Sequence, residues 1–402
     1  MRSTTRLKSE VDSIVKTLES KKIEYTNGSI GWVSIWPFDE RDPTVIHDAT
    51  LYRGQTGIGF FLAAHGYVTE SAQSLELAHQ VFQPWLKTPP EMIEIDHANG
   101  MTGISSLVYA LMECSKFLDD SMYLKQAVDI AASIDIEAIQ SDERNDILAG
   151  NAGLLLVLTE LVSVTQQRQD KIRRRALVAA DRLLDTATST DSGVGIGWNT
   201  VENYPQTGFA HGGTGIAYAL LKAFQVFSEP KYQDTAREAL AFEDSLFELS
   251  RHNWAASANR RRYQRNWCWG SEGILLGRFA MQATGLDYTM PEETTRILSE
   301  FLSRVPAGHS LCHGVAGRAM VLNYLRERLS PEVPCEIAPT SLLEQVRSHR
   351  LEHGHYDISG LEHAHASRLS LFRGISGVGY ACLYDQYQSR LPNPLLLESS
   401  LE

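Results

Sequence analysis

The sequence has few cysteines and no long apolar stretches, and each shortage excludes a class of protein. Its 402 residues include five cysteines, too few for a disulfide-stapled secreted fold, so we expect a reducing compartment, the cytoplasm. Neither an 18-residue apolar run nor a secretory leader is found, so no membrane span is expected. Acidic residues outnumber basic ones by 49 to 37. This charge balance excludes nucleic acid as an expected partner, because phosphate binding needs a basic face.

A repeated Gly-x-x-Gly pair runs through the chain instead. Successive pairs begin about 44 to 62 residues apart, and most are followed at once by an apolar stretch with few charges. Such a stretch is typical of a buried helix whose first turn is a glycine-rich loop. The pairs are Gly54/Gly57, Gly100/Gly103, Gly150/Gly153, Gly212/Gly215, Gly270/Gly273, Gly314/Gly317 and Gly374/Gly377.

More polar segments with helical spacing lie between the buried helices and predict an outer layer. They are Ser71 to Leu86, Ser121 to Ser133, Arg168 to Thr186, Lys231 to Leu249 and Glu292 to Val305. A helical pair repeated seven times cannot bury its apolar face alone, whereas closing the array into a ring removes both exposed ends. The predicted fold is therefore all-α: an α/α toroid of seven helical hairpins with the glycine loops at one end. An open solenoid is the alternative.

The chain is predicted to form one domain, residues 1–402, because no low-complexity linker divides it. Within residues 1–50, Thr4 to Lys22 has an amphipathic helical pattern and Trp32 to Trp36 alternates like a strand, which suggests a lid or edge segment. Residues 51–402 form the toroid. Thr188 to Gly208 and Arg350 to Ser370 are polar and weakly periodic, and we predict loops there.

Two cysteines and a histidine occupy equivalent places in neighbouring repeats. Cys268 and Cys312 each stand two residues before the first glycine of a pair, and His313 follows Cys312. Equivalent places should lie side by side on one rim of the ring. These residue types bind zinc at sites with one open position, although adjacent Cys and His also occur without metal. A zinc ion is the predicted cofactor.

A second histidine shares the same relation to a glycine loop. His211 precedes Gly212 as His313 precedes Gly314, and a histidine beside a metal can act as a general acid or base because it titrates near neutrality. Its alternative role is a loop histidine bonded to backbone. Asp146 lies four residues before Gly150, where it could orient a histidine or cap a helix.

Other cysteines and histidines have simpler explanations. Packing is the expected role of three cysteines, and solvent exposure explains a polar histidine tract. These residues are Cys114, Cys335 and Cys382, and His353, His355, His363 and His365.

Taken together, these motifs make the chain resemble the lanthipeptide synthetase cyclases, called LanC-like proteins. The combination of Trp-Cys-x-Gly with Cys-His-Gly one repeat later, after an upstream His-Gly, carries the resemblance across nearly the whole chain. The likeness is greatest to the C-terminal cyclase region of class II enzymes. Its signs are Leu51-Tyr52-Arg53-Gly54, the Gly374 to Tyr380 stretch and the closing Pro394 to Glu398. Those enzymes carry an N-terminal dehydratase that is not found here, so we expect a free-standing cyclase or a piece of a longer synthetase.

The resemblance implies thioether formation in a dehydrated precursor peptide, the expected partner, with a separate dehydratase as a further candidate. A peptide cysteine would attack dehydroalanine or dehydrobutyrine and close a lanthionine or methyllanthionine ring. Cys268, Cys312 and His313 would bind the zinc that activates this thiol. His211 would then protonate the resulting enolate at the α-carbon, and Asp146 would orient His211.

Two positions depart from the family pattern, and three other functions remain open. Trp269 stands where many members have Tyr or His, and Gln264 replaces an arginine, with Arg265 one step closer to the cysteine. Arg265 and Trp269 are candidate substrate-binding residues; for Arg265, surface solvation is the alternative. The other functions are glutathione addition to dehydroamino acids, peptide binding without catalysis, and glycoside hydrolysis. The last lacks an evident pair of rim carboxylates.

Overall fold

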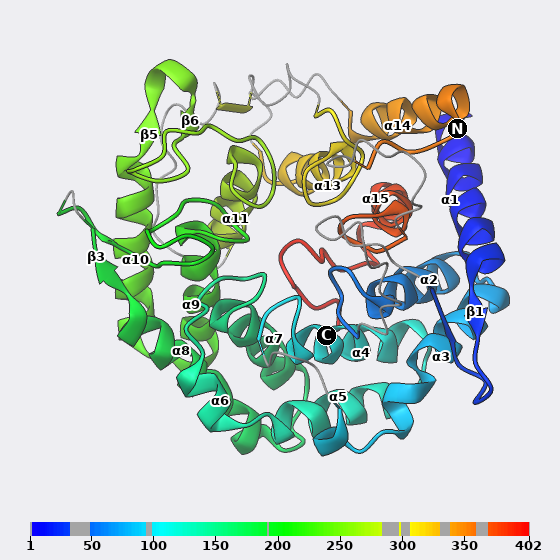
Figure 1. Cartoon of the computed structure of the whole chain (residues 1–402), viewed down its shortest axis with the longest axis horizontal. Coiled ribbons are helices and arrows are strands. Elements are labelled where there is room, and N and C mark those ends of the chain that lie inside the picture. Colours follow the sequence, from blue (N-terminus) through cyan, green and yellow to red (C-terminus); the bar gives the residue numbers. More distant parts are fainter. Residues whose placement is uncertain are drawn as a thin grey trace, which may run out of the picture.

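Helices in two concentric layers form a ring around a filled centre (Figure 1). The computed structural model describes residues 2–32, 49–93, 99–190, 193–283, 297–298, 306–329, 338–358 and 369–401. Within these ranges the inner layer consists of α2 (Gln55–Thr69), α4 (Ile104–Phe117), α7 (Asn151–Val164), α9 (Gly213–Phe227), α11 (Ser271–Ala283), α13 (Val315–Arg326) and α15 (Ile375–Tyr387).

The inner layer is closed. Each inner helix packs against the next along the chain, and α15 packs against α2. The side chains of α2 and α7 are buried almost throughout, as expected for helices covered on all sides. The predicted α/α toroid of seven units is therefore confirmed, and an open solenoid is excluded.

Outer helices cover the ring from outside. They are α3 (Ala72–Lys87), α5 (Ser121–Ser133), α8 (Gln169–Thr186), α10 (Pro230–Ser245), α14 (Pro339–His353) and α1 (Arg2–Lys21). The first four match the predicted segments to within a few residues. α1 packs on α14 and α15, so this predicted helix belongs to the outer layer. The predicted helix Glu292 to Val305 lies almost entirely outside the described residues.

α14 is the outer helix that the sequence pattern did not reveal. The loop predicted from Arg350 is wrong as far as His353, because α14 continues to that residue. Its buried apolar side chains are confined to Leu342, Leu343 and Val346, besides Pro339 at the first turn. So few apolar positions give a weak periodic signal.

Short elements complete the described chain. Three two-residue strand pairs are antiparallel: β1 (Ile23–Glu24) with β2 (Ile30–Gly31), β3 (Thr188–Ser189) with β4 (Ile196–Gly197), and β5 (Phe247–Glu248) with β6 (Asn253–Trp254). One α-helical segment, α6 (Ile136–Ser141), and two 3₁₀ turns, η1 (Pro90–Met92) and η2 (Leu249–Arg251), connect larger helices. The predicted strand from Trp32 to Trp36 lies outside the described residues beyond Trp32.

Backbone hydrogen bonds join the loops that precede the inner helices into a belt. In each bond, an amide of one loop donates to a carbonyl of a neighbouring loop. The second glycine of a pair lets each loop fold tightly onto the start of its own helix, since a Cβ on Gly215 or Gly317 would collide with the carbonyl oxygen six residues earlier in the same loop. The bonds run from Tyr52 to Met101, Met101 to Ile147, Ile147 to Ala210, Ala210 to Cys268, Cys312 to Phe372 and Phe372 to Tyr52.

The second unit has a different register from the predicted one. Gly103, the second glycine of its pair, is the N-cap of α4, whereas the N-caps of α2 and α7 are the first glycines, Gly54 and Gly150. Ser106 therefore takes the place of the second glycine. Its hydroxyl donates to the Gly103 carbonyl at 2.7 Å and accepts from the Leu51 amide at 3.1 Å, which links the first two loops.

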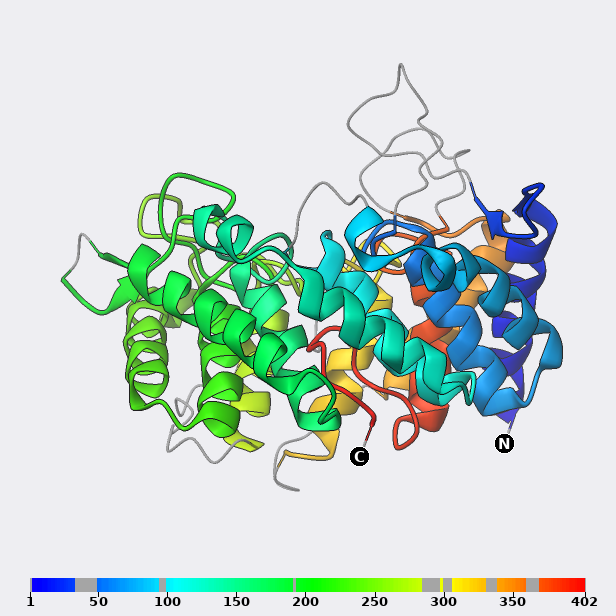
Figure 2. The same cartoon turned by 90° about the horizontal axis from the view of Figure 1, so that it is seen from below.

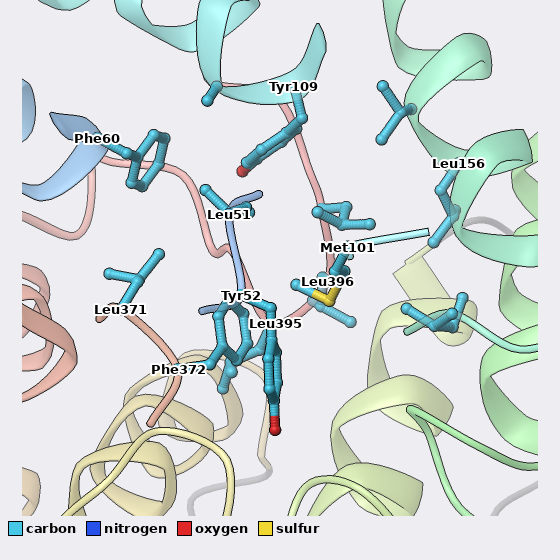
Figure 3. Packing of buried hydrophobic residues seen from close by; sticks show 14 of the residues in the cluster. Leu51, Tyr52, Phe60, Met101, Tyr109, Leu156, Leu371, Phe372, Leu395 and Leu396 are labelled. Carbon is cyan, nitrogen blue, oxygen red and sulfur yellow. The ribbon is translucent and has the colours of Figure 1, made fainter. Parts of the chain in front are cut away.

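The C-terminal segment fills the centre of the ring (Figure 1). Leu395 and Leu396 are fully buried and lie among side chains that the inner units contribute (Figure 3). The Leu395 carbonyl accepts a bond from Trp267 Nε1 at 3.1 Å, and the Glu398 carbonyl accepts one from the Tyr109 hydroxyl at 2.9 Å. Viewed from the side, both labelled chain ends lie on the same face of the ring (Figure 2).

Candidate functional site

Cys268 and Cys312 meet between the loops of α11 and α13. Among the described residues, no backbone hydrogen bond of the belt joins Cys268 to Cys312. Instead, their sulfur atoms lie 2.7 Å apart. Both side chains are buried and both thiols are free. His313 Nε2 lies 3.9 Å from Cys312 Sγ. Within the described part of the chain, Cys268, Cys312 and His313 are the group of three possible metal ligands whose donor atoms all lie within 4.8 Å of one another.

The two thiols differ in acidity. Burial alone would raise the pKa of Cys312, but hydrogen bonding with Cys268, the adjacent His313 and the Tyr52 hydroxyl lower it well below its ordinary value. Burial raises the pKa of Cys268, and the neighbouring Cys312 raises it further. The pair therefore favours a thiolate at Cys312, the form in which cysteine binds metals.

Tyr52 and Arg373 complete the surroundings of the sulfurs, and sequence reasoning missed both. The Tyr52 hydroxyl donates to Cys312 Sγ at 3.0 Å, and its ring stacks on Phe372. Burial lowers the pKa of Arg373, but Tyr52 and Cys312 raise it above its ordinary value. The repeat contained the signal. Tyr52 stands two residues before Gly54 as Cys312 stands before Gly314, and Arg373 precedes Gly374 as His313 precedes Gly314.

His211 and Asp146 form a buried pair. His211 Nδ1 lies 2.7 Å from Asp146 Oδ2, and each side chain is 6% exposed. A carboxylate can only accept, so Nδ1 donates and Nε2 is the nitrogen available for proton transfer. The other carboxylate oxygen accepts from the Ala149 amide at 2.7 Å. Asp146 thus binds both the loop before α7 and the imidazole, but it does not cap that helix, whose N-cap Gly150 receives no side-chain hydrogen bond.

The Trp269 side chain lies next to both His211 and His313. Its indole stacks on the His211 ring with centroids 4.5 Å apart and planes inclined by 25°, and its ring centroid lies 6.3 Å from that of His313. Stacking on a flat aromatic surface restricts the rotation of the imidazole. Trp269 therefore gives His211 a flat, rigid neighbour.

Arg265 is placed near the site without a defined substrate contact. Burial raises the pKa of Glu272 to about 7, and His313 and Arg265 are among the positive groups that oppose this rise. The Arg265 charge therefore lies close to the first turn of α11. Its role in substrate binding remains a prediction.

Comparison with known proteins decides the family. A family model described as "Lanthionine synthetase C-like protein" matches residues 45–396. The chain belongs to the lanthionine synthetase C-like family. It is 23% identical over 203 residues to the Lacticin 481/lactococcin biosynthesis protein LcnDR2 of Lactococcus lactis subsp. lactis. That match covers 46% of this chain and 19% of the relative, so the chain matches less than a fifth of that protein's length.

A solved structure supports the same fold. The structure named "Nisin cyclase" superposes with a TM-score of 0.66 at 18% sequence identity, covering 90% of this chain and 95% of that one. Agreement over nearly both chains establishes that they share the toroid fold. The predicted resemblance to LanC-like proteins is thus confirmed by the family match and by the fold.

A buried carboxylate supports the loop that carries His211 in this LanC-like chain. Glu243 on α10 is fully buried, and one of its oxygens accepts from the amides of Gly208 at 2.8 Å and Thr214 at 3.3 Å. Its other oxygen binds Arg278 Nη2 at 2.9 Å and the Thr214 hydroxyl. Glu243, a residue of the outer layer, thereby holds the loop before α9, which carries His211.

The polar histidine tract lies apart from this site. The ring of His353 stacks on that of His349 with centroids 4.2 Å apart, and His355 Nδ1 lies 3.0 Å from the His353 carbonyl oxygen. His363 and His365 lie outside the described residues, as does Cys335. Among the described helices, none combines the length and the apolar character that a membrane crossing requires.

Proposed function

We propose that this chain is a zinc-dependent lanthipeptide cyclase, which closes lanthionine or methyllanthionine rings by adding peptide cysteine thiols to dehydroalanine or dehydrobutyrine. The observation that carries the proposal is the Cys268, Cys312 and His313 group beside the His211–Asp146 pair, in a chain of the lanthionine synthetase C-like family. The metal donors and the acid–base pair come from separate repeats and face one rim.

The donor set fits zinc. Two thiols and one imidazole are the ligand types found at zinc sites, and three protein ligands leave a fourth position for a substrate sulfur. Zinc, when bound, would deprotonate the peptide thiol at neutral pH. Tyr52 gives Cys312 a hydrogen-bond donor, which reduces the charge on this sulfur and its nucleophilicity relative to that of the substrate.

Ring closure forms one new bond at each of the two carbons of the dehydroamino acid's double bond. The substrate sulfur adds to the β-carbon, and the electron pair of the double bond moves toward the adjacent carbonyl. The protonated His211 then donates its Nε2 proton to the α-carbon, and the proton released by the thiol returns to His211. Asp146 accepts from Nδ1 throughout, so the imidazole keeps the orientation needed for transfer.

The partners and the setting follow from the same proposal. The substrate is a dehydrated precursor peptide, and a dehydratase must act before this chain, either as a separate protein or as part of a longer one. Residues 1–402 would act as a single cyclase domain, with α1 completing the outer layer. We place this activity in the cytoplasm, where thiols remain reduced.

Mass spectrometry with thiol alkylation tests the proposal, because cyclisation changes no mass but consumes a thiol. We expect a dehydrated, cysteine-containing peptide to lose one alkylation site per ring on incubation with the zinc-loaded protein. Cys312→Ala should abolish this loss and reduce bound zinc. Cys382→Ala is the matched control, since Cys382 is also buried and free but lies on α15 away from the group.

Two outcomes would contradict the proposal. Full zinc binding and full activity in Cys312→Ala would refute the proposed metal site. Addition of free glutathione to a dehydroalanine peptide, without ring closure in a cysteine-containing one, would favour the glutathione-adding function instead.

A further inference from the structure

A small polar pocket opens beside the indole of Trp269. Its volume is about 120 Å³, and Ser257, Arg260 and Arg262 are among the residues that line it. Because the same indole stacks on His211, a group bound in this pocket would lie next to the acid–base pair. Neither the zinc ligands nor the His211–Asp146 pair lines the pocket, so it is a separate feature of the rim.

Protein donors already occupy many of the acceptor atoms around this pocket. Glu202, Gln206 and Gln264 line it, and one side-chain oxygen of each accepts from a protein donor. These contacts are Arg260 Nη1 to Glu202 Oε1 at 3.1 Å, Thr200 Oγ1 to Gln206 Oε1 at 2.7 Å, and Asn266 Nδ2 to Gln264 Oε1 at 2.8 Å. A ligand that offers only donors would therefore compete with protein donors at these three oxygens.

Two residues that line the pocket each carry a donor with no partner in the described part of the chain. These donors are Trp269 Nε1 and Ser257 Oγ, both buried from solvent, and Ser257 as a whole is 1% exposed. An indole N–H can only donate, and leaving such a group buried without an acceptor is unfavourable. Arg262 adds a positive charge at the exposed side and forms no ion pair with a described residue.

We propose that this pocket binds a carboxylate of the peptide substrate. Once the side chains that cover them shift, Trp269 Nε1 and Ser257 Oγ can donate to the two oxygens of a carboxylate. Its charge complements Arg262 and the partly neutralised Arg260. This inference rests on the proposed cyclase function and adds a preference: the peptide carries an aspartate or glutamate close to the dehydroamino acid. A backbone carbonyl, the other acceptor of a peptide, has no charge for the arginines.

Binding of unreactive peptides tests the pocket apart from catalysis. The probe is a labelled synthetic peptide with one dehydroalanine and a serine in place of cysteine, so that no ring can form. Glutamate is placed at each of the four positions on either side of the dehydroalanine, and each peptide is compared with its glutamine counterpart by fluorescence anisotropy. We expect at least one position where glutamate binds about tenfold more tightly, the effect of a hydrogen bond to a charged group.

Variants in one loop decide whether this pocket is responsible. Ser257→Ala and Arg262→Gln should remove the preference for glutamate. Arg261→Gln is the matched control and should retain it, because Arg261 pairs with Glu248 at 3.3 Å and does not line the pocket. Thermal unfolding of each variant establishes that the fold is intact.

Each result has a defined meaning. Equal binding of glutamate and glutamine peptides at every position overturns the inference, and so does a preference that survives in both Ser257→Ala and Arg262→Gln. Ring closure in a cysteine-containing peptide is measured separately. A carboxylate preference without ring closure would contradict the cyclase function while supporting the pocket, and ring closure without a preference would do the reverse.

Discussion

Asparagine at position 146 keeps the shape of the aspartate but changes its hydrogen bond with His211. One oxygen of Asp146 accepts from the Ala149 amide at 2.7 Å, so the amide oxygen of asparagine must occupy that place. Its NH₂ group then faces His211 Nδ1, where the carboxylate oxygen lay at 2.7 Å. Because both would be donors, neutral His211 must move its proton to Nε2.

The expected loss follows from the bond that is exchanged. A hydrogen bond to a charged group contributes about 1.5–3 kcal/mol, and each 1.4 kcal/mol corresponds to about a factor of ten. Removing it from a buried pair therefore slows a step that needs the imidazolium by about 10- to 100-fold. The change of tautomer adds to this loss. We expect Asp146→Asn to cyclise about 100-fold more slowly, or slower still.

Single-turnover cyclisation with thiol alkylation measures this effect. Zinc content should stay close to that of the wild type, since Asp146 does not contact the cysteines, and thermal unfolding establishes that the variant is folded. The control is the double variant Asp146→Asn/His211→Gln, which should be no slower than His211→Gln alone if the aspartate acts through the histidine. A wild-type rate in a folded, zinc-loaded Asp146→Asn protein would refute the reasoning.

Three further predictions concern the metal site and the stability of the fold. Tyr52→Phe removes the donor to Cys312, so chelator competition should show zinc bound about tenfold more weakly, and Tyr109→Phe, equally buried, should leave affinity unchanged. Glu243→Gln turns an NH₂ group toward other donors, Arg278 included, and should lower the free energy of unfolding in urea by about 3 kcal/mol; a loss below about 1 kcal/mol would contradict it. Burial lowers the pKa of His309 to about 4, whereas the unfolded chain protonates near pH 6.5. The free energy of unfolding should therefore rise from pH 4 to 6.5, less steeply in His309→Gln, and an equal slope would count against this assignment.

The repeat and the metal donors could be predicted from the sequence because their signals are local. Glycine pairs followed by apolar helices identify the inner layer, since a glycine is needed where each loop folds tightly onto the start of its own helix. Cys268, Cys312 and His313 could be found because they occupy equivalent places in that repeat. α14 was missed because few of its residues are buried, which leaves too weak a periodic pattern.

The closure of the ring decides which residues that are distant in the sequence come into contact. Tyr52 and Cys312 are 260 positions apart, and they meet only because α15 packs on α2 and returns the last loops to the first. The pairing of Asp146 with His211 and the stacking of Trp269 on that histidine likewise depend on how neighbouring loops are positioned. The sequence by itself determined the number of units and the types of chemical group on the rim, because these follow from local pattern. The distances between those groups depend on packing across the whole ring, and only the tertiary structure decided them.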